Sequence, residues 1–274
     1  MTLPTALTDR LLAGTVVPYL GPRTLELTPE YAVPATPEAL AARLTAKVSV
    51  PYRIRGRLTQ SAQFIENFKH RRTLVDLMDE AFAQPPVPSA LHRALARIAP
   101  PLVVDAWYDN AMAAALADRR DWGQVQGLSQ SEHFGTWTGW YGASGAPVPD
   151  PDPQWKTILY KPLGAQAPAG NYLVSDSDYV EVLTEIDIQT PIPREVQALR
   201  TGRGFLFLGC RFNDQLPRGF ARQIMKRSSD RHWAVLPDEP TRMEARFLAE
   251  QGIERIAVPL DAFAEALCAT LEPA

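Results

Sequence analysis

The stretch "VVPYLGPRTL", residues 16–25, begins as a buried strand and ends in an unusual loop. A short apolar run that meets a glycine is typical of the first strand of an α/β fold that binds nucleotides, because glycine lets backbone amides approach a phosphate closely. Here Gly21 is followed by Pro22, which has no amide hydrogen, and by Arg23, which adds a long cationic side chain. The stretch therefore predicts the fold and leaves open what its loop binds.

Length and composition indicate an ordinary globular chain. The 274 residues are 46% hydrophobic and 22% charged, with a formal net charge of -3 and 25 prolines. A chain of this size can bury a full core, so we predict one domain over residues 1–274 that carries insertions. The slight acidity argues against nucleic acid as a partner.

Cysteine content and hydropathy point to the cytoplasm. Cys210 and Cys268 are too few for a disulfide framework or for a four-cysteine zinc site. The chain does not open with a basic segment and an apolar block, and no run reaches the roughly 18 apolar residues that span a bilayer. We expect a soluble cytoplasmic protein with no membrane partner.

Apolar runs alternate with amphipathic helical patterns, which predicts a mostly parallel α/β sheet flanked by helices. Thr241, followed three residues later by Glu244, predicts a capping box for a helix over about 242–251, and Ser89 predicts the cap of the helix "ALHRALARI". Strands are expected at residues 16–20, 102–107, 157–163, 205–210, 232–236 and 255–258.

Two segments are predicted to be insertions. Residues 34–83 carry helical patterns only, which indicates a helical insertion. Residues 119–156 hold four of the six tryptophans between glycine breaks, which favours a small antiparallel ribbon. Its aromatic side chains either pack on the sheet as a lid or form a stacking surface for a sugar or base. We favour packing, because buried tryptophan more often serves packing than recognition.

Five stretches follow one another along nearly the whole chain, namely "YLGPRTL", "LHRALARIAPPLVVDAWYDNAMAAAL", "ILYKPLGA", "NYLVSDSDYVEVL" and "FLFLGCRFNDQL". In this order they resemble the sirtuin-like family of the bacterial, zinc-less type. That family has a Gly-Ala-Gly loop, then Thr-Thr-Asn-Tyr-Asp, Lys-Leu-His-Gly and Phe-Leu-Gly-Tyr-Ser-x-x-Asp segments. The resemblance implies a Rossmann-like sheet that binds nicotinamide adenine dinucleotide (NAD), and active members cleave its glycosidic bond.

The resemblance also implies that the catalytic positions are degenerate. Trp107 stands at the position of the family's asparagine, and Leu163 stands at the position of its histidine. Neither side chain can take up a proton or accept a hydrogen bond. Asp109 matches the family's aspartate, which would face the nicotinamide amide. The same carboxylate could instead cap the helix "NAMAAAL", and we favour that interpretation.

Two arginines are predicted to enter the cofactor cleft that the resemblance implies. Arg23 follows the first strand, and Arg211 stands where the family has a small residue near the ribose and phosphates. Their guanidinium groups could grip a phosphate or a carboxylate, or they could fold outward or fill an empty cleft. Asp109 and Asp214 are the expected counter-charges. The predicted cofactor-binding residues are Gly21, Pro22, Arg23, Trp107, Asp109, Gly209, Cys210, Arg211 and Asp214.

Other candidate residues have simpler interpretations. His92 is expected to be a hydrogen-bonded structural histidine, and Cys210 a small buried thiol. We predict no metal site, because the remaining histidines show no ligand spacing, namely His70, His133 and His232. The basic segments "RIRGR", "KHRR" and "RQIMKRSSDR" could bind a polyanion or an acidic partner, but most such runs form solvated helix faces.

These observations lead to two hypotheses for the function. The favoured one is a sirtuin-like protein without catalysis that binds a phosphate-bearing nucleotide, NAD or ADP-ribose, or that interacts with a protein partner. The alternative is an NAD-hydrolysing enzyme in which Asp109 replaces the lost base. The resemblance alone also raises an accessory role in bacterial nitrogen fixation.

Overall fold

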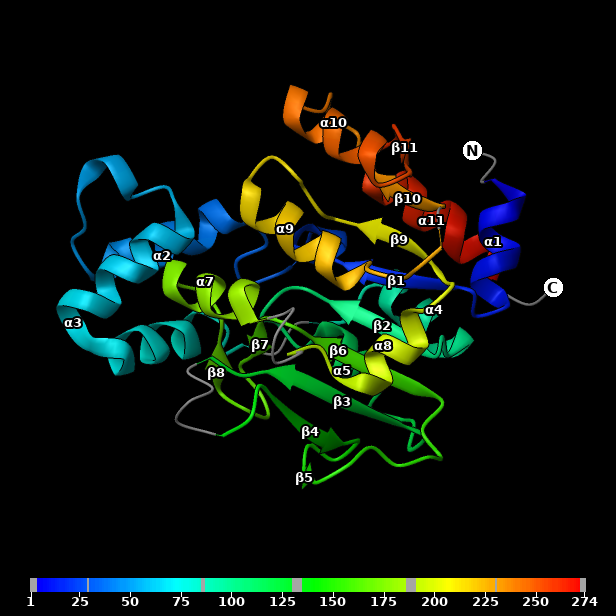
Figure 1. Cartoon of the computed structure of the whole chain (residues 1–274), viewed down its shortest axis with the longest axis horizontal. Helices are drawn as coiled ribbons and strands as arrows, with labels where there is room; N and C mark the ends of the chain where they lie inside the picture. Colours follow the sequence, from blue (N-terminus) through cyan, green and yellow to red (C-terminus); the bar gives the residue numbers. More distant parts are fainter. Residues whose placement is uncertain are drawn as a thin grey trace.

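A central sheet of nine strands organises the molecule (Figure 1). The computed structural model describes residues 4–28, 30–84, 87–129, 135–185, 191–229 and 231–271. His133 lies outside these residues. The strand order is β11-β10-β9-β1-β2-β6-β3-β4-β5, and all neighbours from β11 to β3 are parallel. The strands are β1 (Val16–Leu20), β2 (Leu102–Asp105), β3 (Trp122–Gly127), β4 (Thr138–Gly142), β5 (Pro147–Val148), β6 (Thr157–Lys161), β9 (Gly204–Leu208), β10 (His232–Val235) and β11 (Ile253–Ile256).

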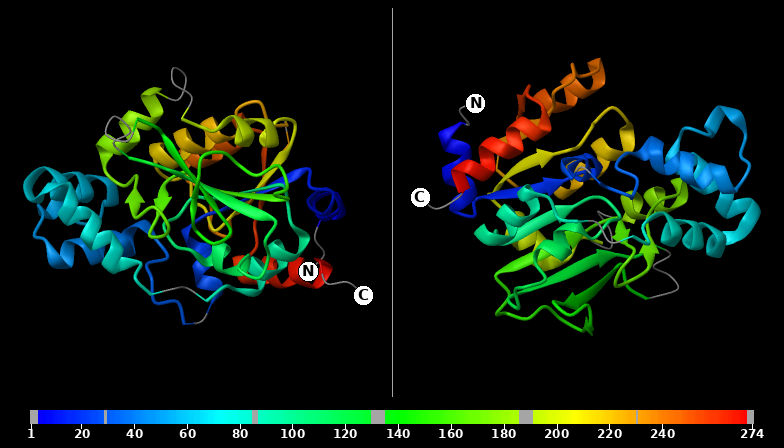
Figure 2. Two further views of the ribbon diagram at one scale, coloured as in Figure 1. Left: turned by 90° about the horizontal axis from the view of Figure 1, so that it is seen from below. Right: turned by 180° about the vertical axis from the view of Figure 1, so that it is seen from behind.

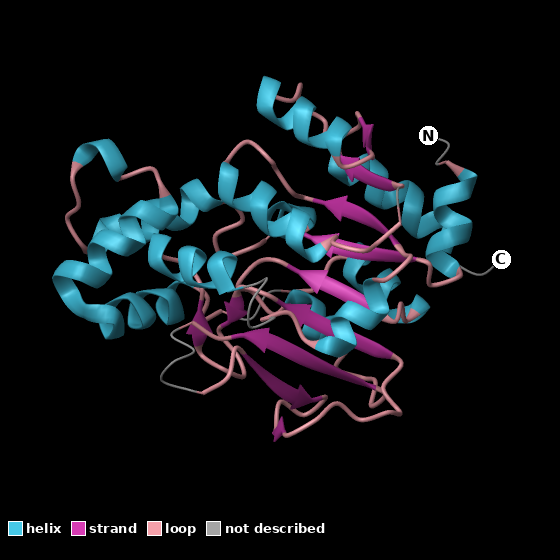
Figure 3. Cartoon of the chain, viewed as in Figure 1, coloured by secondary structure: helices cyan, strands magenta, loops and turns pink. Residues whose placement is uncertain are grey.

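Helices cover both faces of the sheet, as the alternating pattern predicts (Figure 3). One face packs its buried side chains against α1 (Thr5–Leu12), α4 (Ala90–Ile98), α5 (Ala111–Ala115) and α11 (Leu260–Leu271). The other face packs against α7 (Asp176–Glu185), α8 (Arg194–Arg200), α9 (Gln215–Ile224) and α10 (Arg242–Glu250). Among the described residues, no helix is both long and apolar enough to cross a membrane. The predicted mostly parallel, Rossmann-like α/β fold is confirmed.

The tryptophan-rich segment is more closely joined to the main sheet than expected. Its first strand, β3, is buried along its whole length and pairs in parallel with β6. Only β4 and β5 continue as an antiparallel ribbon. The Trp155 ring lies against Gly123, where a Cβ atom would come within 2.2 Å of the indole. This tryptophan therefore packs on the sheet, because only glycine leaves room for it.

A helical arm extends beyond the carboxyl ends of the strands (Figures 1 and 2). It consists of α2 (Pro37–Lys47), the short helix η2 (Tyr52–Ile54) and α3 (Leu58–Ala81). α3 bends at His70, whose φ of 71° and ψ of 153° are not helical. That conformation is rare for any residue other than glycine, so the bend is held by the contacts around it. We call residues 34–83 the arm.

The order of the strands fixes where a ligand of a doubly wound sheet would bind. From β1 the chain crosses to β2 on one side, and it returns later to β9 on the other side of β1. In such sheets ligands bind outside the carboxyl ends of the strands where the order reverses. The loops after β1 and β9 are therefore the first place to look for a site, as the sequence predicts.

Candidate functional site

The loops after β1 and β9 lie in direct contact. The amide of Gly21 donates to the carbonyl of Leu208 at 2.8 Å, and the amide of Arg23 donates to Gly209 at 3.2 Å. The amide of Thr24 donates back to Gly21 at 3.2 Å. Pro22, which has no amide hydrogen, begins a short helix, η1 (Pro22–Leu27). The amides that would cradle a phosphate are thus bonded to carbonyls of the chain itself.

Both glycines at this contact are needed for loop packing. A Cβ atom at Gly21 would lie 2.6 Å from the Gly209 oxygen and 2.7 Å from the Cys210 sulfur. Gly209 has a φ of +67°, and its Cβ would lie 2.6 Å from the Thr24 nitrogen. Cys210 is buried, and burial raises the pKa of its thiol far above the ordinary value. The two glycines therefore allow the loops after β1 and β9 to meet. The raised pKa means that the Cys210 thiol stays protonated.

The two arginines come together, and carboxylates of the chain neutralise them. Arg211 donates to both oxygens of Glu244, from Nε at 3.0 Å and from Nη2 at 2.9 Å. Its Nη1 donates to Asp238 at 2.8 Å. Arg23 contacts the same Asp238 oxygen at 3.7 Å and Glu26 at 3.6 Å. Asp238, whose side chain is 57% exposed, therefore bridges both guanidinium groups.

Glu244 is the buried centre of this network. Its side chain is fully buried, and besides Arg211 it accepts the amides of Phe212 at 3.0 Å and Thr241 at 2.9 Å. Burial alone would raise the pKa of this carboxyl. The hydrogen bonds from Arg211, Thr241 and Phe212 outweigh burial and hold the pKa below its usual value. Glu244 is therefore a buried carboxylate that stays ionised, because side-chain and backbone groups of the same chain donate hydrogen bonds to it.

The expected counter-charges of the arginines cap helices instead. Asp109 accepts a hydrogen bond from the Ala111 amide at 2.8 Å, at the start of α5. Asp214 is the N-cap of α9 and accepts from the Leu216 amide at 3.0 Å. The expectation that these two aspartates neutralise the arginines is wrong. Each of these carboxylates already accepts a hydrogen bond from an amide at a helix start. The arginines pair instead with Asp238 and Glu244, which follow β10 in the sequence.

Trp107 and Leu163, which the sequence resemblance places at the family's catalytic positions, belong to the apolar core. Trp107 is buried, and its Nε1 donates to the Pro34 carbonyl at 2.8 Å, so its single polar group is used within the fold. Its ring centroid lies 6.1 Å from that of Phe82. Leu163 is also buried and belongs to the same core cluster. Neither position offers a group that could take up a proton.

A buried ion pair lies at the carboxyl ends of β2 and β6, and sequence reasoning missed it. Lys161 donates to Asp105 at 2.7 Å, and both side chains are buried. Burial raises the pKa of Asp105, the Lys161 charge opposes this shift, and Asp109 adds to it. The sequence does contain a signal for this pair: Asp105 and Lys161 are the last residues of two apolar strands. The carboxyl ends of neighbouring parallel strands meet at one edge of the sheet, so two charged residues there could have been expected to pair.

His92 has the structural role that its helix position predicts. It forms a capping box with Ser89: the Ser89 amide donates to Nδ1 at 3.3 Å, and the hydroxyl lies 2.7 Å from the same nitrogen. Burial lowers the pKa of His92 to about 4, so the ring is neutral near pH 7. No group of three or more His, Cys, Asp or Glu side chains within the described ranges could hold a metal ion.

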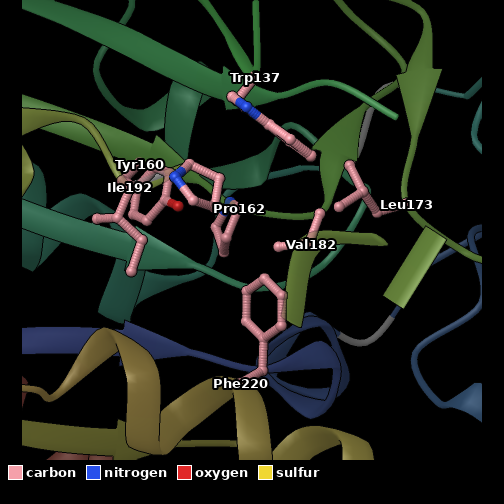
Figure 4. A pocket seen from close by; sticks show the side chains of 9 residues that line it. Trp137, Tyr160, Pro162, Leu173, Val182, Ile192 and Phe220 are labelled. Carbon is pink, nitrogen blue, oxygen red and sulfur yellow. The ribbon is translucent and has the colours of Figure 1, made fainter. Parts of the chain in front are cut away.

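A small apolar pocket lies near the ends of β3 and β6, beside α7 and α9 (Figure 4). Every described residue that lines it is uncharged. Trp137, Tyr160 and Phe220 supply its aromatic walls, and Pro162 lies among them. Apolar walls of this kind offer no partner for a pyrophosphate.

Comparison with known proteins assigns the chain to a family. The model of the SIR2-like domain matches residues 101–256, from the start of β2 to the end of β11. The comparison with curated proteins gave no significant match. The matched segment covers more than half of the 274 residues, and it contains Trp107, Leu163 and the loop after β9. The resemblance to sirtuin-like proteins is therefore confirmed at the level of the family: this chain belongs to the SIR2-like domain family.

Proposed function

We propose that this protein is a SIR2-like domain that has exchanged catalysis for binding, and that its partner is another protein. The observation that carries the proposal is the contact between the loops after β1 and β9. There the amides of Gly21, Arg23 and Thr24 donate to carbonyls of the chain, and Arg211 is held by Glu244 and Asp238. The groups that would bind a dinucleotide phosphate are already paired within the fold.

The chemistry of NAD cleavage supports the loss of activity. Breaking the bond to nicotinamide creates a cation on the ribose, so a site needs polar groups that hold the ribose and a base that takes up a proton. Trp107 and Leu163 stand at the two positions where the family resemblance places such groups, and both are buried among apolar side chains. Asp109 is buried and already accepts a helix amide.

The residues present do not fit NAD, the cofactor that the family implies. The loop amides are used, both arginines have carboxylate partners, and the pocket beside α7 and α9 has only uncharged walls. A pyrophosphate would lose its hydration without gaining partners. A protein partner needs no such site, since it can bind the exposed surface. The accessory role in bacterial nitrogen fixation stays a prediction from the resemblance alone.

Incubation of the purified chain with NAD, followed by chromatography for nicotinamide, tests the loss of catalysis. We expect release no faster than in a buffer blank, because a single general acid or base supplies about 10²–10⁴-fold of rate and both positions lack one. Turnover that disappears in an Asp109→Ala variant would contradict the proposal and establish the enzyme instead.

One observation favours a second candidate, a site for a phosphate-bearing small molecule such as NAD or ADP-ribose. Asp238 is exposed and bridges Arg23 and Arg211, so an incoming phosphate could take the place of its carboxylate. Thermal melting of an Asp238→Asn variant with inorganic phosphate and ADP-ribose separates the two candidates. A ligand-dependent rise in Tm that Arg23→Ala abolishes would favour the second candidate, because ligands that bind the folded state stabilise it. We expect no rise in the parent.

A further inference from the structure

The arm carries a charge opposite to that of the remaining chain. Residues 34–83 contain eight Lys and Arg and five Asp and Glu, whereas the remaining residues contain 20 and 26. The arm lies at one end of the molecule, beyond the carboxyl ends of the strands (Figures 1 and 2). A basic projection on an acidic body attracts an acidic partner to the projection and repels the same partner from the body.

The turn at η2 exposes an aromatic side chain next to arginines that form no ion pair with the described residues. Tyr52 is 89% exposed, which is rare for a large aromatic ring in a folded protein. Arg53, Arg55 and Arg57 follow it in sequence and are also exposed. Within the part of the chain that the structure describes, none of these three arginines has an ion-pair partner. Arg211 and Arg71, in contrast, are each paired with carboxylates.

The bend of α3 repeats this combination. Phe68 is 66% exposed and stacks on Phe64, with ring centroids 4.3 Å apart. Lys69 and Arg72 flank the bend at His70 and are exposed. Like the arginines of the turn, they form no ion pair among the described residues. Free arginines and lysines beside exposed rings are the composition of surfaces that bind carboxylates together with apolar side chains.

The arm is anchored firmly enough to present these residues in a fixed arrangement. Arg71, directly after the bend, donates to both oxygens of Asp178 at 3.1 and 2.9 Å. Its other nitrogen donates to the Ser129 hydroxyl at 2.6 Å and to the Tyr172 carbonyl. Asp178 is buried at the start of α7. A half-buried arginine with this many partners joins α3 to the core, so a partner need not order the arm on binding.

We propose that the arm is a docking surface for an acidic segment of a partner protein, which contacts the exposed side chains of the η2 turn and of the α3 bend, with carboxylates on the cations and an apolar side chain against Tyr52 or Phe68. This inference rests on the proposed function, in which the protein works by binding. Charge complementarity selects the occupant. A long polyanion such as nucleic acid or a membrane surface would also meet the acidic body, whereas a short segment can contact the arm alone.

Fluorescence anisotropy of a labelled synthetic peptide with the repeat Asp-Glu-Phe-Glu tests the docking surface. We expect saturable binding to the full chain that weakens as salt rises. The triple variant Arg53→Gln, Arg55→Gln, Arg57→Gln should bind about tenfold more weakly, which corresponds to roughly 1.4 kcal/mol. A peptide with Asn and Gln at the acidic positions should not bind.

A matched triple variant provides the control. Arg97, Arg120 and Arg242 are exposed and lie outside the arm, so changing all three to glutamine alters the net charge equally. This control should bind the acidic peptide as the parent does. Equal loss in both triple variants, or no binding by the parent, would overturn the docking surface. So would preferential binding of an oligonucleotide or of vesicles containing phosphatidylserine.

A second copy of the chain is the remaining occupant, because its acidic body also complements the arm. Sedimentation of the parent over a range of concentrations tests this. Association that the arm triple variant abolishes, without peptide binding, would replace the acidic partner by self-association. The nicotinamide assay is independent of both results, so failure of the docking surface can be told apart from failure of the proposed function.

Discussion

Single side chains hold together the segments that follow β1, β9 and β10. Glu244 accepts hydrogen bonds from Thr241, Phe212 and Arg211, so one carboxylate caps α10 and neutralises an arginine of the loop after β9. The sequence predicts the capping role, because the spacing of Thr241 and Glu244 is local. It does not predict the pairing with Arg211, which depends on how α10 packs beside that loop.

Glu244→Gln should lower the free energy of unfolding by about 2 kcal/mol, because it removes the buried one of the two carboxylates that pair with Arg211 and leaves only Asp238. The value lies below that of a fully buried pair, since Arg211 is 27% exposed and water screens part of the interaction. Urea denaturation measures the change. Glu250→Gln, which breaks the exposed pair with Arg246, should leave the midpoint unchanged. Equal effects of the two variants would refute the buried role.

His92 should make stability depend on pH below neutrality. Burial lowers its pKa to about 4 in the folded protein, against 6.5 for the free side chain. Between these values the unfolded chain takes up a proton and the folded chain does not, so the free energy of unfolding falls as pH falls. The loss from this group should be about 2 kcal/mol between pH 7 and pH 5. Above pH 6.5 its contribution stays constant.

His92→Gln isolates this effect, because glutamine at the same position can still form the capping box with Ser89. Asp109, Lys161 and Arg93 are the charged groups that act on the ring, and all remain in the variant. Urea melts at pH 7 and pH 5 should show a smaller drop for the variant than for the parent. The same drop in both would mean that the ring is protonated in the folded state.

At the scale of elements, the contact between the loops after β1 and β9 depends on the absence of a side chain. Gly21→Ala should lower the free energy of unfolding by about 1–3 kcal/mol, because the added Cβ meets the Gly209 oxygen and the Cys210 sulfur. Gly56→Ala, where a Cβ has open space, is the control and should not destabilise the protein. Thermal melting compares them. An unaffected Gly21→Ala would show that the loops are apart in solution.

The arm should loosen when its anchor is removed. Arg71→Met takes away the hydrogen bonds to Asp178 and Ser129, and it should speed amide hydrogen exchange in residues 34–83 more than in β1 or β9. Arg72→Met removes an adjacent exposed arginine and should leave exchange in the arm as it is in the parent. Uniformly faster exchange across the chain would show that Arg71 stabilises the whole fold and not the arm.

Elements with a strong local pattern could be predicted from the sequence. The expected strand at 16–20 has the observed bounds, and those expected at 102–107 and 157–163 end two residues earlier, at Asp105 and Lys161. The parallel placement of β3 could not be predicted, because tryptophan, glycine and glutamine in "WGQVQG" do not form an apolar run. This strand is buried by its neighbours β6 and β4, and that burial is a tertiary effect.

On the scale of the whole molecule, the meeting of the two arginines could be predicted from the sequence, but the carboxylates that pair with them could not. Arg23 and Arg211 do meet, as the positions of their loops after neighbouring strands predict. Their partners, Asp238 and Glu244, follow β10, and no motif in the sequence connects them to the cleft. Capping motifs and the strongly apolar strands are encoded over short stretches, whereas ion pairs between distant segments are fixed only by the packed fold.

Calorimetric titration of the purified protein with ADP-ribose tests most directly whether the chain's own groups close the cleft. The paired loop amides and the carboxylates on Arg23 and Arg211 predict no saturable heat of binding. Saturable binding that is lost in both Arg23→Ala and Arg211→Ala would contradict the closed cleft, because it would show that a phosphate displaces Asp238 and opens the contact between the two loops.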